Sequence, residues 1–468
     1  MAEQQDQAKR EQILATIKAE DVRFVNLEFT DVVGMAKCVT IPVEQLPDCL
    51  IHGKWFDGSA IEGFARVAES DMYLFPDLET FAILPGKVRP QEITASILTA
   101  PDDQFLEAGA VARIICDVRA PDGVRFDGDP RATLYHALEV AHSMGYNFLV
   151  APELEFFLLH LEDNTPTPLP HDRGGYFDLS TDLAAAVRRQ MVQALQQMGI
   201  RIEASHHEVA AGQHELDFET AEALHIADGL MTAKYIIKGI AAQHDLYATF
   251  LPKPFFGVNG SGMHTHQQLI SSATGQNVFV DEHGEYGLSD IGHYFIAGQL
   301  AHARAMCAIL APLVNSYKRL VPGFEAPVFI KWGRVNREAL IRVPRPGTDR
   351  QLTARIELRC PDPSSNPYLA LAVMLRAGLD GIQRKLPLPP AMDESLFLRD
   401  EGERQRHRTK LLPATLGEAL EGLREDSLIR ETLGDSIYEG FIEAKSFEWM
   451  EYRKQVHAWE LERYLPVF

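Results

Sequence analysis

Cysteine is scarce in this 468-residue sequence, and the cysteines present form no recognisable pattern. There are five, an odd number, and no two of them make a Cys-x-x-Cys pair. A disulfide framework and a zinc–cysteine site are therefore disfavoured, and the usage is typical of a reducing compartment. We expect a cytoplasmic protein.

Long apolar runs are missing as well. The longest, "AMCAILAPLV" (305–314), is far shorter than the roughly 20 residues that a membrane-spanning helix needs. The amino terminus, "MAEQQDQAKREQ", is polar and lacks the apolar centre of a signal peptide. Neither a membrane nor a secretory destination is predicted.

Positive charge is under-represented, since 45 lysines and arginines face 66 acidic residues and the formal charge is −21. Such a charge disfavours nucleic acid and anionic membranes as partners. Arginine is nevertheless concentrated between Arg319 and Arg359. A basic pocket in an acidic protein indicates a small anionic substrate. The sequence also has no GxxxxGK[ST] motif, so any ATP would be bound by metal ions and arginines rather than by a P-loop.

The length predicts two domains. We place the boundary near residue 110, where short segments punctuated by glycine and proline give way to longer strands and helices, and so expect domains 1–110 and 111–468. The predicted elements are a helix at 8–20, a hairpin at 22–42, a buried strand at 109–118, a helix capped by Asp129, helices at 182–199, 220–245 and 289–313, helical spacing at 363–385 and a largely helical region at 413–463.

Two glutamates interrupt the apolar segment "VAPELEFFLLH" (150–160). Glu153 and Glu155 are two residues apart, so in a strand both carboxylates lie on one face. Like charges on a buried face repel each other and lose hydration unless a cation lies between them. The alternative is an edge strand with both glutamates facing solvent.

Further carboxylates occur in two other segments. "EASHHEVAAGQHELDFET" (203–220) adds Glu208 and Glu215 among histidines and small residues. In "TARIELRCPDP" (353–363), Arg355, Glu357 and Arg359 alternate onto one face, a pattern suited to a metal ligand beside a phosphate. The alternative for this last segment is a surface ladder of ion pairs.

The segment "NGSGMHTH" (259–266) places His264 and His266 two residues apart after a glycine-rich turn. The simple interpretation is a turn followed by a strand with surface histidines. Together with the five glutamates, however, His264 completes a set of mostly oxygen ligands that favours Mg²⁺ or Mn²⁺ over structural zinc. Six ligands suffice for two ions, which with the arginines predicts phosphoryl chemistry.

The chain closely resembles a type I glutamine synthetase over essentially its whole length. The resemblance is carried, in order, by "FDGSAIEGFARVAESDMYLFPD" (56–77), "APELEFFL" (151–158), "SHHEVAAGQHELDF" (205–218), "LPKPFFGVNGSGMHTH" (251–266), "NSYKRLVPGFEAP" (315–327) and "RIELRCPDPSSNPYLALAVMLRAGLDGI" (355–382). It implies an α+β fold, in which an N-terminal β-grasp domain precedes a catalytic α/β domain whose antiparallel sheet forms part of an intersubunit barrel. It also implies a dodecamer of two hexameric rings, with active sites at subunit boundaries.

The resemblance implies ligation of ammonia to the γ-carboxylate of L-glutamate through γ-glutamyl phosphate, with ATP as co-substrate. One divalent ion would be held by Glu155, Glu208 and Glu215, and the second by Glu153, His264 and Glu357. Substrate contacts would come from Asn259, Gly260, Arg319, Glu325, Arg337 and Arg359. Nucleotide contacts would come from Glu203, His266, Arg337, Arg342 and Arg355.

The ammonium pocket implied by the resemblance consists of Asp57, supplied by the neighbouring subunit, together with Tyr176, Glu208 and Glu325. Asp57, Glu325 and Arg337 would be the catalytic residues. Asp57 would take a proton from ammonium, Glu325 would close a flap over the site, and Arg337 would stabilise the phosphoryl transition state.

The sequence departs from the family pattern at several positions. Ala60 stands where the family has a serine beside the ammonium pocket, and Glu338 replaces a serine next to Arg337. Gln268 likewise replaces a serine, and a lysine common just before the "RIE" strand is absent. Phe397 occupies the position of a tyrosine that is nucleotidylated in some relatives, so that control is not expected. Arg66 resembles a residue of the subgroup inhibited by glutamine, and the alternative is a plain surface arginine.

Two other functions remain open. Loss of the hydroxyl at Ala60 would enlarge the ammonium pocket, which favours a ligase that joins glutamate to a primary amine or polyamine. A non-catalytic relative is the third possibility, although such a protein should have lost metal ligands, and all six are present.

Overall fold

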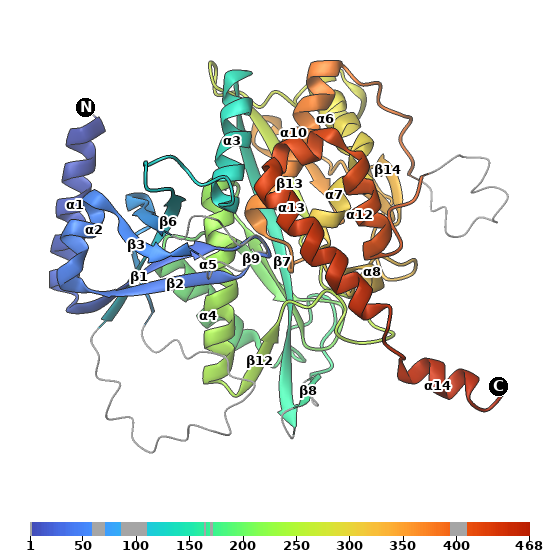
Figure 1. Cartoon of the computed structure of the whole chain (residues 1–468). Helices are drawn as coiled ribbons and strands as arrows, with labels where there is room; N and C mark the ends of the chain where they lie inside the picture. Colours follow the sequence, from blue (N-terminus) through green and yellow to red (C-terminus); the bar gives the residue numbers. More distant parts are fainter. Residues whose placement is uncertain (1, 59–70, 86–109, 163–164, 169–171, 394–409) are drawn as a thin grey trace.

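The computed structural model describes residues 2–58, 71–85, 110–162, 165–168, 172–393 and 410–468. In these ranges the chain forms two mixed sheets and the helices that cover them (Figure 1). No helix in the described part is long and apolar enough to cross a membrane.

The first sheet has six strands, in the order β2-β1-β6-β4-β3 with β5 paired to β6. The predicted hairpin at 22–42 is confirmed, because β1 and β2 pair antiparallel, while β6 runs parallel to β1. The strands are β1 (Val22–Thr30), β2 (Ala36–Pro42), β3 (Lys54–Asp57), β4 (Asp71–Pro76), β5 (Ala82–Ile83) and β6 (Ala110–Arg119), and the helices of this region are α1 (Ala2–Ala19), η1 (Val43–Gln45), α2 (Leu46–His52) and η3 (Leu78–Thr80).

Alternation along β1 gives the first sheet two different faces. Val25 and Leu27 are fully buried in a core that also contains Ile13 and Ile17 of α1. The intervening side chains face the opposite side, toward α5 (Ala223–Gln243) of the larger domain. Since β6 belongs to this sheet, the boundary expected near residue 110 precedes a strand of the first sheet, and its position stays a prediction.

The second sheet has ten strands, and β7 lies at its centre. The order is β14-β15-β16-β13-β7-β10-β9, with β8, β11 and β12 also paired to β7. Apart from the parallel pair β14–β15, its strands pair antiparallel. The strands are β7 (Tyr146–Glu162), β8 (Thr165–Pro168), β9 (Ile202–His207), β10 (Gln213–Phe218), β11 (Ala221–Glu222), β12 (Leu246–Thr249), β13 (Thr265–Ser271), β14 (Phe329–Gly333), β15 (Ala339–Arg342) and β16 (Ile356–Leu358).

Helices pack against this sheet around the main core, in which the central helix α10 (Pro367–Arg384) is almost entirely buried. The predicted cap of α3 (Pro130–Ser143) is confirmed, because the Asp129 side chain accepts a hydrogen bond from the backbone N–H of Arg131. The other helices are α4 (Ala185–Gln197), η5 (Glu285–Gly287), α6 (Asp290–Ala301), α7 (Ala303–Leu310), α8 (Ser316–Arg319), α9 (Arg350–Thr353), α12 (Leu416–Glu425), α13 (Ser427–Tyr452) and α14 (Ala458–Tyr464).

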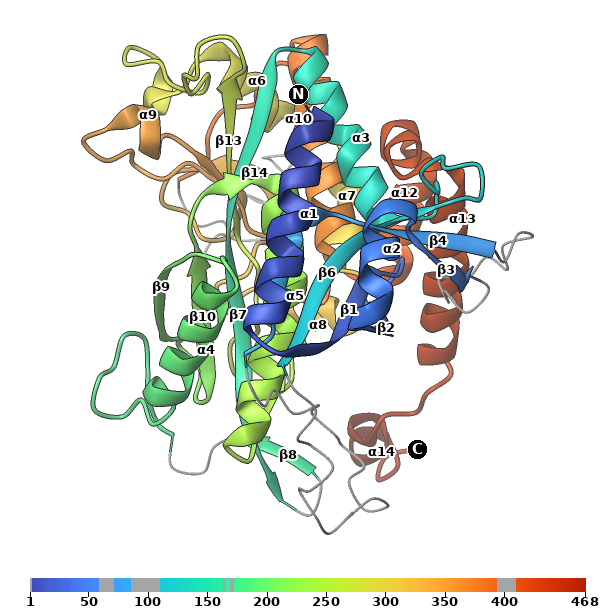
Figure 2. The ribbon, with the colours of Figure 1, turned by 90° about the vertical axis from the view of Figure 1, so that its left-hand side faces the viewer.

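One predicted helix is wrong in detail. The segment 289–313 was expected to form a single helix, but α6 ends and α7 begins at His302, whose backbone leaves the helical region. The C-terminal helix α14 stands apart from the body of the molecule in both views (Figures 1 and 2).

Candidate active site

A cavity of about 610 Å³ opens along the carboxylate-bearing strands of the second sheet. Its walls contain most of the residues singled out in the sequence. Those are Glu153, Glu155, Tyr176, Glu208, Glu215, Asn259, Gly260, His264, Arg319, Glu325, Arg337, Arg342, Glu357 and Arg359.

The pairing of β7 places Glu153 and Glu155 in the middle of the sheet. β7 is bonded to β13 on one side and to β10 on the other, and Glu155 lies directly opposite Glu215 of β10. The edge-strand alternative is therefore wrong. Both glutamates line the cavity, as the alternation along a strand predicts.

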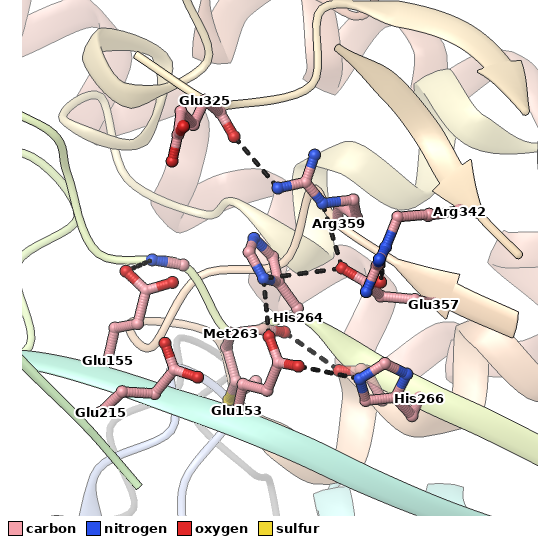
Figure 3. A network of polar contacts seen from close by, with 12 residues as sticks. Glu153, Glu155, Glu215, Met263, His264, His266, Glu325, Arg342, Glu357 and Arg359 are labelled. Atoms are coloured by element: carbon pink, nitrogen blue, oxygen red, sulfur yellow. Dashed lines mark hydrogen bonds and ion pairs between the residues drawn. The ribbon is translucent and has the colours of Figure 1, made fainter. Parts of the chain in front are cut away.

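Both histidines of the 259–266 segment converge on Glu153 (Figure 3). His264 Nδ1 lies 2.8 Å from Glu153 Oε2, and His266 Nε2 lies 2.8 Å from Oε1. Burial would raise the pKa of Glu153, but these two hydrogen bonds outweigh it and hold that pKa well below its usual range. The simple interpretation of surface histidines is wrong.

Glu357 lies on the other side of His264. His264 Nδ1 is 3.8 Å from Glu357 Oε1, and Glu153, His264 and Glu357 offer ligand atoms that are all within 4.8 Å of one another. Arg359 Nε donates to Glu357 at 3.1 Å, and Arg342 Nε also donates to this carboxylate. Since Glu357 and Arg359 are buried, the surface-ladder alternative for 353–363 is wrong.

A second cluster consists of Glu155, Glu208 and Glu215 with His206. His206, Glu208 and Glu215 again offer ligand atoms within 4.8 Å of one another. Burial and the charge of Glu208 raise the pKa of Glu155 to about 8, while burial and the charges of Glu155 and Glu153 raise the pKa of Glu215 well above its ordinary value. Glu208 thus opposes the ionisation of Glu155, and Glu155 opposes that of Glu215.

The repulsion between these buried carboxylates indicates whether the residues fit a metal ion. Ionised carboxylates that repel one another in a buried site are stabilised by a cation between them, and oxygen-rich donor sets with one imidazole suit Mg²⁺ or Mn²⁺. The two clusters therefore fit the two divalent ions that the sequence predicts.

Two glycines allow the close packing beside these clusters. A Cβ atom on Gly260 would overlap the carbonyl oxygen of Pro252, and one on Gly262 would overlap the guanidinium of Arg319. Arg319 is buried and donates to the backbone carbonyls of Arg359, Cys360 and Pro361. The glycine-rich turn thus lets an arginine lie directly against the backbone at the cavity wall.

Glu325 and Arg337 lie at the mouth of the cavity and face each other. Arg337 Nη1 donates to Glu325 Oε1 at 2.8 Å, and both side chains are about half exposed or more. Glu325 has a φ of +55°, which is unfavourable for a residue with a side chain. Strain of this kind is common in segments that move during function.

Several predicted residues do not line the cavity. His266 and Arg355 form an outer layer, in which Arg355 Nε donates to His266 Nδ1. Glu203 is exposed on β9, and Asp57 is exposed at the end of β3, in the other domain. The side chain of Gln268, which stands where the family has a serine, donates from Nε2 to the carbonyl of Leu352. Ala60, Arg66 and Phe397 lie outside the described residues.

Other cavity residues were not singled out in the sequence: His206, Gln213, Asp217, Phe177 and Phe324. Gln213 donates to Glu155 at 2.9 Å and so orients that carboxylate. His206 precedes Glu208 by two residues, a spacing that places both side chains on the same side of an extended segment, and this spacing is the signal that would have identified it. Phe177 follows Tyr176 on a loop, where no periodicity marks a functional position.

Comparison with known proteins points to one family. A model of the glutamine synthetase β-grasp domain matches residues 21–121, and a model of the glutamine synthetase catalytic domain matches residues 127–464. A glutamine synthetase of Thermus thermophilus is 50% identical over 460 residues, which are 98% of this chain and 99% of that protein. A glutamine synthetase of Clostridium saccharobutylicum is 48% identical over 97% of this chain and 98% of that protein.

Solved structures agree. A structure of GmaS in complex with ADP is similar with a TM-score of 0.84 at 29% identity, and the match covers 97% of this chain and 99% of that one. A β-grasp domain followed by a catalytic domain is the arrangement that the two sheets form. The chain therefore belongs to the glutamine synthetase family of ligases.

Proposed function

We propose that the protein joins ammonia to the γ-carboxylate of L-glutamate, with ATP converted to ADP and phosphate through γ-glutamyl phosphate. The observation that carries this proposal is a single cavity that contains all six predicted metal ligands and four arginines. The names of the relatives and the ADP found in the GmaS structure support the same reaction and the same nucleotide.

Two divalent ions, Mg²⁺ or Mn²⁺, are part of the proposal. Glu155, Glu208 and Glu215 would hold one, and Glu153, His264 and Glu357 would hold the other. When bound, the ions supply positive charge against the oxygens of the transferring phosphoryl group. The second assignment is supported by the ligand atoms of Glu153, His264 and Glu357, which lie within 4.8 Å of one another. For the first, Glu208 and Glu215 form such a group with His206, and Glu155 lies opposite Glu215 in the sheet.

The arginines would act on the substrates. Arg319 and Arg359, both buried at the cavity wall, are suited to a carboxylate or phosphate, because a guanidinium binds either with two hydrogen bonds. Arg337 is more exposed and held by Glu325, so it would reach the phosphoryl group when the segment around Glu325 closes. Closure would exclude water from γ-glutamyl phosphate, which hydrolyses readily.

The second step would use the acidic side of the cavity. Glu208 and Glu325 make this side negative, which attracts ammonium, and Tyr176 borders it. Burial and the charge of Glu208 raise the pKa of Tyr176 to about 12, so its hydroxyl stays neutral and able to donate. Asp57 would accept the proton that converts ammonium to the attacking ammonia.

The test is phosphate release from MgATP and glutamate, with ammonium compared against a panel of primary amines. Saturable release at low ammonium concentration is expected. Turnover with an amine but little with ammonium would instead establish the alternative, a γ-glutamyl ligase for organic amines, and would point to Ala60. Absence of any glutamate-dependent release would contradict both.

We further propose a homo-oligomer, expected to be a dodecamer, in which each cavity is completed by a neighbouring subunit. Two observations support it: Asp57 is exposed on β3 outside the cavity walls, and α14 carries exposed apolar side chains such as Trp459 and Leu461. Light scattering on the purified protein should give about twelve times the 52.3 kDa chain mass. A monomer with full activity would contradict the shared site.

The regulation of the protein and its location in the cell are also proposed, each from one observation. Direct inhibition by glutamine rests on Arg66 in the sequence, and Arg66→Ala should weaken that inhibition at unchanged kcat. A cytoplasmic location is supported by the five cysteines, all of which are free thiols.

A further inference from the structure

A second cavity, of about 270 Å³, lies between the first sheet and the helices of the larger domain. The sheet contributes side chains of β1, β2 and β6, and the opposite wall is formed by α5 and by Tyr368 at the start of α10. None of these residues belongs to the active-site cavity. Its size suits a metabolite smaller than a nucleotide.

The sheet presents charged groups to this cavity because of its register. Arg113 of β6 pairs with Asn26 of β1, and Glu28 lies two residues further along β1, so both side chains are on the face that looks toward α5. The other face is the apolar core of the first domain. A guanidinium and a carboxyl group therefore share one cavity wall.

Arg113 is the exceptional group. It is only 3% exposed, and its Nε and Nη1 have no hydrogen-bond partner in the part of the chain that the structure describes. A buried polar group without a partner is destabilising, and more so when it is charged, so such groups are rare in native proteins. Within the described ranges, Arg113 also forms no ion pair with a carboxylate.

The carboxyl group of Glu28 is the second ionisable group in this part of the cavity wall. No hydrogen bond or ion pair of its carboxyl group is found among the described residues, and burial raises its pKa while Arg113 opposes the rise. The two charged groups therefore attract each other without touching. The nearby cation Lys37 is engaged elsewhere, in an ion pair with Asp31 at 3.3 Å.

The rest of the cavity wall is mainly apolar. Phe29, Ile115 and Met231 line it beside the two charged groups. A ligand that meets all three requirements has a carboxylate for Arg113, an ammonium group for Glu28 and a small apolar substituent. We propose that this cavity binds a free α-amino acid with a small apolar side chain, at a site separate from the active site.

The test uses the full-length protein in calorimetric titrations. Saturating glutamate and MgADP occupy the active site, and ammonium is left out. The probes are L-valine, 3-methylbutanoate, which lacks the ammonium group, and isobutylamine, which lacks the carboxylate. We expect saturable binding of L-valine at one site per chain, and at least tenfold weaker binding of the two other probes.

Variants locate the site. Glu28→Gln keeps the shape of the side chain and should weaken L-valine binding at least tenfold, while Arg113→Met should abolish it. Glu44→Gln and Arg23→Met remove the same charges from exposed positions of the first domain and should change nothing. If Arg113→Met fails to fold, the effect of Glu28→Gln on L-valine binding still tests the proposal.

Three results would overturn the proposal. Equal binding of 3-methylbutanoate would identify a simple anion site, and absence of L-valine binding would mean that only water bridges Arg113 and Glu28. Binding unaffected by Glu28→Gln would place L-valine elsewhere. Because binding is measured directly, none of these results depends on the ligase reaction.

Discussion

At the scale of the residue, Glu153 organises one half of the active-site cavity. It receives both imidazoles of the 259–266 segment, and Arg355 in turn bonds to the outer nitrogen of His266. Because Arg355 can only donate, His266 Nδ1 accepts and its Nε2 carries the proton that faces Glu153. His266 is therefore a supporting donor, while His264, nearer to Glu357, remains available as a ligand.

This difference gives the first prediction. His264→Ala should raise the Mg²⁺ or Mn²⁺ concentration needed for half-maximal activity by about 10–100-fold, since loss of groups that form a metal site has effects of that size. His283→Ala, at an exposed position outside the cavity, is the matched control. An unchanged metal requirement for His264→Ala would remove this residue from the ligand set.

Asp172 is a second single residue that shapes the site, although it does not line the cavity. Its carboxylate accepts hydrogen bonds from His207 Nε2 at 3.1 Å and from the backbone N–H groups of Gly174 and Gly212. His207 Nδ1 donates in turn to the carbonyl of Glu208 at 2.6 Å. Asp172 thereby joins the loop that carries Tyr176 to the strand end that carries Glu208.

The second prediction follows from these contacts. Asp172→Asn places an amide N–H₂ against donors, so the loop and Glu208 should lose their positions while the fold persists. We expect at least a tenfold fall in kcat and a parallel rise in the metal concentration required. Asp6→Asn, an exposed aspartate, should leave both unchanged. A fall in thermal stability with normal metal dependence would show a purely structural role.

At the scale of the element, the junction between α6 and α7 depends on one histidine. His302 Nδ1 lies 2.6 Å from Asp426 at the start of α13, and Nε2 lies 3.1 Å from Asp380 of α10. Burial alone would lower the pKa of His302, but these two carboxylates outweigh it and raise the pKa above 6.5. The charged imidazole thus holds the break in the helix against two neighbouring helices.

The third prediction concerns pH. Since the folded-state pKa of His302 is raised, its contribution is complete below about pH 6.5 and is lost as the pH rises through the raised value. His302→Gln should therefore lose about 2 kcal/mol at pH 6, the order expected for hydrogen bonds to charged groups, and less at pH 9.

Urea unfolding at one fixed protein concentration measures this difference, because association also contributes to the stability of an oligomer. His283→Gln, the same change at an exposed site, should match the wild type at both pH values. A loss that is equal at pH 6 and pH 9 would mean that the charge of His302 does not contribute.

At the scale of the whole molecule, Arg131 links the two domains through ion pairs. Its buried guanidinium pairs with Asp77 at 2.6 Å and Asp117 at 2.5 Å in the first domain, and with Asp228 of α5 at 2.9 Å in the larger one. The active-site cavity and Asp57 lie on different domains, so this contact also fixes how the domain that carries Asp57 is oriented relative to the cavity.

The fourth prediction is that Arg131→Met destabilises the protein by about 3–5 kcal/mol, because it leaves buried carboxylates without their cation. Arg125→Met is the control, since Arg125 is more exposed and its contact with Asp117 is longer, at 3.4 Å. Urea midpoints of the two variants should differ clearly. Equal midpoints would show that the domains are held by apolar contacts alone.

Sequence reasoning succeeded where a local rule decides the outcome. The alternation in 150–160 identified Glu153 and Glu155 as carboxylates of one face, and the Asp-Pro pair marked the start of α3. It failed at His302, where helix periodicity continues through the break and the side chain contacts Asp380 and Asp426, which are far away in the chain and which no local pattern brings to mind as its partners. It also missed His206, whose role depends on where Glu208 and Glu215 lie in space.

The sequence by itself determined which chemical groups are available: carboxylates and a histidine as candidate ligands for divalent ions, arginines suited to anions, and motifs that place the chain in its family. Only the tertiary structure decided the geometry. The pairing of β7 with β10 and β13, and of β13 with β16, brought the predicted ligands from four segments into one cavity. The register of β1 with β6 placed Arg113 in a buried position where, among the described residues, its Nε and Nη1 have no hydrogen-bond partner. Residue types follow from local composition, whereas distances and burial follow from contacts between segments that are remote in the chain.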